Sequence, residues 1–124
     1  YVFIVHDLTI AEFFCDRLAV LYLGQVMESG SAKTLFADPQ HPYTVSLLSA
    51  VPRVGAKVGG RIVLEGEVSP LGSGASQGCV FRARCPVGRN RPICAEERPA
   101  LRPHGAEDHT VACHFPGELS LASA

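Results

Sequence analysis

The sequence predicts an α/β protein: a fragment of a layered domain, followed by a small, irregular segment rich in cysteine. Strand-like and helix-like stretches alternate through residues 1–52, which is typical of α/β folds. Residues 78–116 instead carry four cysteines among many prolines, arginines and glycines. The 124 residues and a formal net charge of −1 fit one domain or domain fragment with a small appendage.

The first stretch pairs a buried strand with an amphipathic helix. Tyr1–Val5 is continuously apolar, β-branched or aromatic, which predicts a strand buried on both faces, as in a parallel sheet. Apolar residues at helical spacing predict a helix over Leu8–Arg17, with Asp7 as its N-cap and Cys15 as a core residue. His6 follows the strand directly. Because ligands in open α/β sheets bind at the carboxyl ends of strands, His6 is a candidate functional residue.

A hairpin and a helix follow. Leu18–Leu23 predicts a strand, Gly24–Gln25 a tight turn and Val26–Ser29 the returning strand. Ser31 is expected to cap a helix over Ala32–Ala37.

A second helix is expected after the loop that ends at Pro42. This proline suits a first helical position, which predicts a helix over Tyr43–Val51 that Pro52 ends. We expect His41 to be structural, capping this helix or docking against an upstream domain. Tyr43 is expected to be a packing residue.

The composition predicts four regions with a boundary near Pro52. The Gly-rich and Lys-rich residues that follow indicate a linker, with a short strand over Arg61–Leu64. A last strand is expected over Thr110–Phe115, before a frayed tail. The predicted regions are residues 1–52, the linker 53–77, the cysteine-rich segment 78–116 and the tail 117–124.

The cysteine-rich segment must be held by something besides its own core. Cys79, Cys85, Cys94 and Cys113 have the spacing C-x5-C-x8-C-x18-C, with few large apolar residues between them. A piece of about 40 residues rarely buries enough surface to fold alone, and depends on disulfides, metals or a neighbour. The opening residues lack the features of a secretory signal, so a reducing compartment and a metal site are expected.

The bulk properties also argue against two classes. The balanced charge argues against a nucleic-acid-binding protein, which is usually strongly basic. No apolar run approaches the 18 residues of a membrane-spanning helix. The chain begins without Met inside an apolar run, so we expect an N-terminal part upstream of it.

Four motifs in order carry a family resemblance. They are VFIVHDL, DRLAVLYLGQVMESG, LFADPQHPYTVSLLSAVP and GCVFRARCP. Together they resemble the C-terminal part of the ATP-binding subunit of an oligopeptide or dipeptide ABC transporter. The resemblance covers about Tyr1–Phe115, and it implies the C-terminal part of a P-loop NTPase fold.

The resemblance implies a nucleotide-related role for His6. It aligns with the family's switch histidine, which contacts the γ-phosphate and the attacking water, in line with phosphoryl transfer by positioning and charge stabilisation. The family usually has Ser-His-Asp here, whereas this chain has Val5-His6-Asp7, a departure that can mark a degenerate site. ATP and Mg²⁺ would be bound mainly by upstream motifs that are absent from these residues. We therefore expect an ATPase as the intact subunit and no activity from the fragment alone.

The resemblance also implies a 4Fe–4S cluster on the four cysteines, as a structural staple or a regulatory sensor. Arg82, Arg84, Arg89 and Arg91 would offset the cluster's charge. Zinc is the alternative cofactor, although the C-x2-C pairs common in structural zinc sites are missing. Disulfides or unliganded thiols remain open, and His109 and His114 are possible alternative ligands.

The implied partners are a second ABC ATPase subunit or domain, transmembrane permease subunits and, indirectly, an extracytoplasmic peptide-binding protein, with no nucleic acid. The implied location is the cytoplasmic face of the membrane. Two hypotheses from other classes are an independent zinc-binding interaction module and a disulfide-stapled extracellular module.

Overall fold

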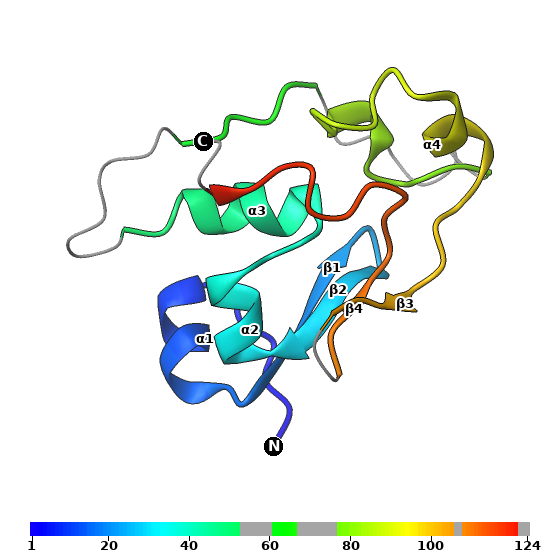
Figure 1. Cartoon of the computed structure of the whole chain (residues 1–124). Coiled ribbons are helices and arrows are strands. Elements are labelled where there is room, and N and C mark those ends of the chain that lie inside the picture. Colours follow the sequence, from blue (N-terminus) through cyan, green and yellow to red (C-terminus); the bar gives the residue numbers. More distant parts are fainter. Residues whose placement is uncertain (53–60, 67–76, 106–107, 122–124) are drawn as a thin grey trace.

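The computed structural model describes residues 1–52, 61–66, 77–105 and 108–121. Two small helices cover one end of a short twisted sheet, and a third helix lies above them, beside the cysteine-rich segment (Figure 1). In chain order the elements are α1 (Leu8–Phe14), β1 (Arg17–Tyr22), β2 (Gln25–Ser31), α2 (Ala32–Ala37), α3 (Pro42–Ser49), the 3₁₀ helix η1 (Arg82–Arg84), α4 (Pro92–Glu96), β3 (Arg102–Pro103) and β4 (Thr110–Val111).

The predicted hairpin forms one side of the sheet. β1 and β2 pair antiparallel, and the strand order is β1-β2-β4-β3. The turn lies at Leu23 and Gly24, with φ of 48° and 75°, one residue earlier than expected. Positive φ at both central residues matches the twist that two-residue hairpins require.

The first helix starts as predicted and ends early. The Asp7 carboxylate accepts hydrogen bonds from the backbone N–H groups of Thr9 and Ile10, so Asp7 is the N-cap. The helix ends at Phe14, not at Arg17 as predicted, because Arg17 already begins β1. Strand pairing with β2 therefore overrides the helical spacing at this boundary.

Two predicted strands are wrong. Tyr1–Val5 is exposed and not in a strand, and Arg61–Leu64 is not in a strand either. In the described part of the chain, strand pairs are recorded only among β1, β2, β3 and β4. A β-branched run becomes a strand only beside a partner, because its backbone groups need a neighbouring strand to complete their hydrogen bonds.

The two middle helices are confirmed. Ser31 caps α2 by accepting from the Thr34 N–H at 3.1 Å. α3 begins at Pro42, with His41 as its N-cap, and ends at Ser49, two residues before the predicted end.

The last part of the chain differs from prediction in two ways. The final strand is limited to Thr110–Val111, but it joins β2, which brings the cysteine-rich segment into the same sheet. The described part of the tail, expected to be frayed, is anchored: the Gly117 N–H donates to the Gln40 carbonyl at 2.9 Å, and Glu118 pairs with Arg91. The predicted linker lies largely outside the described residues, so the proposed domain boundaries remain a prediction.

One aromatic cluster joins the hairpin, α3 and the cysteine-rich segment. Phe81 is fully buried and its ring packs against Tyr22 and Tyr43, with centroids 5.2 Å apart in both pairs. The expected packing role of Tyr43 is thereby confirmed. In the described part of the chain, no helix is long and apolar enough to cross a bilayer.

Candidate functional site

Four short pieces of chain bring the four cysteines to one place. Cys79 precedes η1, Cys85 follows it, Cys94 lies on α4, and Cys113 comes two residues after β4. All four line one cavity of about 10 Å³. A shared site for the four thiols was predicted from the sequence, and the structure places all four around the same cavity.

Local hydrogen bonds and two glycines make this convergence possible. The Cys79 N–H donates to the Cys94 carbonyl at 2.8 Å, and the Gly88 N–H donates to the Cys85 sulfur at 3.2 Å. A β-carbon at Gly88 would lie 2.6 Å from the Cys94 sulfur, and one at Gly78 would lie 2.5 Å from the Cys94 carbonyl oxygen. Glycine is therefore needed at both positions because the chain passes too close for any side chain.

The environment of the cavity keeps the unliganded thiols protonated. Burial raises the pKa of all four thiols, and that of Cys113 to about 12. Neighbouring thiols add to the rise at Cys79, Cys94 and Cys113. Thiolates, not thiols, bind metals. Binding of a metal group would therefore release protons and would favour the charged form of each sulfur.

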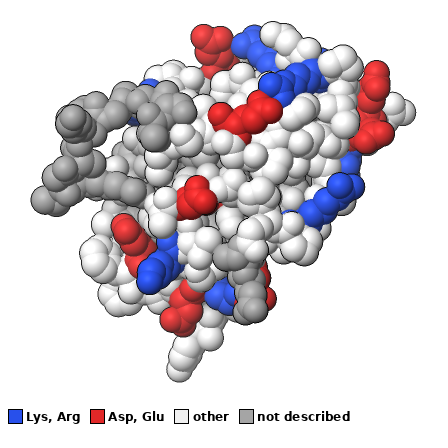
Figure 2. Space-filling view, in the orientation of Figure 1, with Lys and Arg blue, Asp and Glu red and all other residues white. Residues whose placement is uncertain are grey.

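Arginine side chains oppose this rise in the pKa of the thiols. The guanidinium of Arg91 lowers the pKa of Cys85 and Cys94, and Arg82 lowers that of Cys94. Arg89 instead pairs with Glu65 at 3.2 Å. Charges of both signs are interspersed over the face of the molecule seen in Figure 2.

Three histidines in or near the segment have different partners. His114 lines the cavity, and its Nε2 donates to the Glu97 carbonyl at 2.8 Å. The Nε2 of His109 lies 2.6 Å from the Glu28 carboxylate. The ring of His41 also lines the cavity, and its Nδ1 accepts the Tyr43 N–H at 3.0 Å, which confirms its expected capping role.

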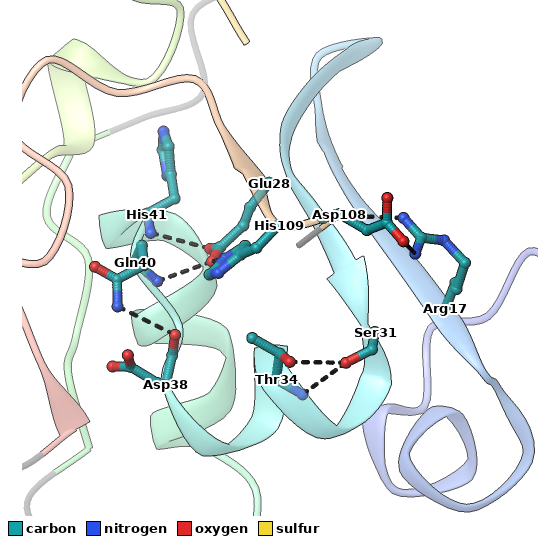
Figure 3. Close-up of polar contacts among 9 residues, drawn as sticks. All are labelled: Arg17, Glu28, Ser31, Thr34, Asp38, Gln40, His41, Asp108 and His109. Atoms are coloured by element: carbon teal, nitrogen blue, oxygen red, sulfur yellow. Dashed lines mark hydrogen bonds and ion pairs between the residues drawn. The ribbon is translucent and has the colours of Figure 1, made fainter. Parts of the chain in front are cut away.

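A buried carboxylate is the feature that the sequence did not indicate. Glu28 on β2 is fully buried and accepts from the N–H groups of Gln40 at 2.9 Å and His41 at 3.0 Å, besides its contact with His109 (Figure 3). These donors satisfy a buried charge that would otherwise be costly. A glutamate directly after Val26 and Met27 in the predicted strand was the available signal, but its partner lies 81 positions away.

The donor set fits a sulfur-ligated inorganic group. Four thiolates suit an iron–sulfur cluster as well as zinc. Within the described ranges, no three Cys, His, Asp or Glu side chains already stand where they could hold a metal ion. The cavity has room for about one water molecule, so the sulfurs would have to move outward to admit such a group.

His6 and Cys15 lie apart from this cavity. His6 is exposed and directly precedes the cap of α1, and the N-terminal stretch lies at the opposite end of the molecule from α4 (Figure 1). Cys15 ends α1 as a half-buried free thiol. Nothing in the fold brings either residue to the four-cysteine site.

Comparison with known proteins gives a consistent set of relatives. Residues 27–94 match the family model of the oligopeptide/dipeptide transporter C-terminal region. The oligopeptide transport ATP-binding protein AppF of Bacillus subtilis (strain 168) is 44% identical over 118 residues, which are 93% of this chain and 35% of AppF. A Brucella ovis protein named for peptide import and ATP binding is 46% identical over 101 residues, 81% of this chain and 31% of that protein.

The chain thus spans about a third of the length of the curated relatives it matches. The family model covers most of β2, all of α2 and α3, and three of the four cysteines. The chain therefore belongs to the family defined by the C-terminal region of oligopeptide/dipeptide transporters.

Proposed function

We propose that the chain is the C-terminal part of the ATP-hydrolysing subunit of an ABC importer for oligopeptides or dipeptides. We further propose that Cys79, Cys85, Cys94 and Cys113 hold a 4Fe–4S cluster with a structural or regulatory role. The single observation that carries the second proposal is that four cysteines from four separate pieces of chain line one cavity.

The surroundings of the cavity support a negatively charged occupant. Arg82 lines the cavity, and the guanidinium of Arg91 favours the thiolate forms of Cys85 and Cys94. Hydrogen bonds from backbone N–H groups reach the sulfurs of Cys85 and Cys113, and such bonds tune iron–sulfur centres. A bound cluster would supply a rigid link between η1, α4 and the end of β4.

The ATPase part of the proposal rests on the family and on an apolar surface. Tyr1, Val2, Ile4, Phe13 and Phe14 are all strongly exposed. Exposed apolar patches of this kind mark surfaces that another protein surface covers. The remainder of a nucleotide-binding domain would cover this patch and place His6 near the ATP phosphates, with Mg²⁺ bound there.

The same family supplies the proposed surroundings of the subunit. It would lie at the cytoplasmic face of the membrane and work with a second ABC ATPase subunit and transmembrane permease subunits. An extracytoplasmic peptide-binding protein would deliver the peptide. Nucleic acid has no part in this proposal.

Metal and sulfide analysis of protein purified without oxygen tests the cluster. We expect about four irons with matching inorganic sulfide per chain and a broad visible absorbance near about 400 nm, which is typical of iron–sulfur centres. Cys85→Ser should abolish the absorbance. Cys15→Ser is the matched control, because Cys15 is a free cysteine outside the cavity, and it should keep the absorbance.

The alternatives give different results in the same experiment. One zinc per chain without sulfide would replace the cluster with a zinc site. Disulfides in the anaerobic protein, detected by mass spectrometry without reductant, would overturn both metal proposals.

Replacement of His6 by Ala tests the ATPase role. We expect ATP turnover by the intact subunit to fall sharply while nucleotide binding is kept, since the residue would act on the transferred phosphoryl group. Unchanged turnover would remove His6 from the mechanism.

A further inference from the structure

The side chain of His41 has one engaged nitrogen and one that is buried without a partner. Its Nδ1 accepts the Tyr43 N–H at 3.0 Å, so the hydrogen of the neutral ring must sit on Nε2. The residue is 1% exposed, and Nε2 has no hydrogen-bond partner in the described structure. An unmet buried donor destabilises a folded protein, so this N–H would be stabilised by a closer acceptor than the bare protein offers.

The unmet donor belongs to a ring on the wall of the four-cysteine cavity. The ring packs on Phe81, two residues after Cys79, with centroids 5.7 Å apart. The backbone carbonyl of Ala112, next to Cys113, also faces the ring and raises its pKa, although it does not complete a hydrogen bond to Nε2. Figure 3 shows the ring extending away from Glu28, on the side opposite the backbone contacts that hold His41.

Hydrogen bonds to the backbone of His41 and to its Nδ1 hold the ring in position. Glu28 accepts the backbone N–H of His41 at 3.0 Å, and the same carboxylate contacts His109 at 2.6 Å. His109 lies four residues before Cys113. These contacts of Glu28, the Glu28 clasp, therefore tie the segment that leads to Cys113 to the start of α3. With its backbone and Nδ1 both held, the ring has little freedom to turn its remaining N–H elsewhere.

We infer that His41 is part of the four-cysteine site, as a hydrogen-bond donor whose Nε2–H meets a sulfur of the inorganic group held there. This inference rests on the cluster proposed above. It gives the His-Pro-Tyr-Thr sequence a second role besides capping α3. A donor to a cluster sulfur stabilises the more negative, reduced state and so raises the reduction potential.

Two substitutions separate the donor role of His41 from its capping role. His41→Asn keeps a side-chain acceptor close to the backbone, where asparagine is among the best N-caps, but its amide is too short to reach the cavity. His41→Gln extends an amide N–H toward the position of Nε2 and gives up the preferred cap. Each variant therefore retains one of the two functions.

The measurement is the reduction midpoint of the anaerobically purified protein, with its iron and sulfide content and thermal unfolding. We expect His41→Asn to lower the equilibrium constant for one-electron reduction about tenfold, which corresponds to about 59 mV. We expect His41→Gln to stay near the wild-type midpoint and to unfold at a lower temperature. If His41→Asn loses iron while His41→Gln keeps it, that result also supports the inference.

Three results would overturn the inference. Equal midpoints in all three proteins would show that Nε2 does not meet the group, and would leave the proposed cluster intact. Equal shifts in both variants would assign the effect to the helix cap. A wild-type protein without iron and sulfide would overturn the proposed cluster and this inference together.

Discussion

At the scale of single residues, two buried polar side chains are held in different ways. Glu28 meets two backbone N–H groups and His109, so its carboxylate is surrounded by donors. His41 instead lies in an apolar setting beside Phe81. Burial lowers the pKa of His41 to about 4, and the backbone of Ala112 opposes this only in part. His41 is therefore neutral in the folded protein at pH 7.

This lowered pKa predicts a loss of stability in mild acid. Between about pH 6.5 and pH 4 the unfolded chain protonates His41 and the folded chain does not, so the free energy of unfolding falls as pH falls through this window. The total loss from this residue is about 3 kcal/mol. Urea unfolding at pH 7 and pH 4.5 should show a smaller loss for His41→Asn than for the wild type.

A substitution at an exposed residue without a titratable group provides the control for this experiment. Leu101→Ala should leave the pH dependence of unfolding as it is in the wild type. Identical pH dependence in the wild type and His41→Asn would contradict the prediction.

At the scale of elements, the cysteine-rich segment consists of pieces too short to be stable alone. η1 has three residues, α4 has five, and β3 and β4 have two each, whereas isolated helices shorter than about 12 residues are marginal in water. Arg91 holds the C-terminal turn that contains Phe115 and Glu118. Its guanidinium forms two hydrogen bonds to Glu118, at 3.0 and 2.7 Å, and lies 3.9 Å from the centre of the Phe115 ring.

Replacement of Arg91 should loosen this turn. Arg91→Gln removes the paired hydrogen bonds and the stacked cation, which together are more specific than an ordinary surface ion pair. We expect amide hydrogen exchange in residues 113–121 to become several-fold faster. Arg89→Gln is the matched control two positions away, since Arg89 pairs with Glu65 instead, and equal effects of the two variants would refute a special role for Arg91.

At the scale of the whole molecule, the cysteine-rich segment and the preceding region share both a sheet and a core. β4 pairs with β2, and the buried cluster of Tyr22, Met27, Phe81 and Cys85 takes residues from both regions. The segment therefore depends on a neighbour for its apolar packing, besides any group bound by its cysteines.

Phe81 should consequently support the whole described fold and not the segment alone. Phe81→Ala removes a fully buried ring, and such changes cost about 3–5 kcal/mol. Denaturant unfolding should show one transition at a lower midpoint for probes in β1 and α4 alike. Leu101→Ala, at a residue that is 46% exposed, is the control and should have little effect on the midpoint. If Phe81→Ala lowered the midpoint only for the probe in α4, the two regions would unfold separately.

Local patterns explain which elements the sequence could predict. The caps at Asp7, Ser31 and His41 and the hairpin near Gly24 depend on residues a few positions apart, so short-range chemistry was enough. Tyr1–Val5 has strand-forming residues but no partner strand in the described structure, so its composition was misleading. The Glu28–His109 pair could not be foreseen, because no local pattern links two residues 81 positions apart.

By itself the sequence determined the family, the grouping of the four cysteines and most of the helix starts, because each depends on residue identity at fixed spacing. Only the tertiary structure decided how the cysteine-rich segment is supported. Phe81, β4 and the Glu28 clasp bring distant parts of the chain into contact. Such contacts depend on side-chain packing and on hydrogen bonds to buried polar groups. A short stretch of sequence does not predict either of them.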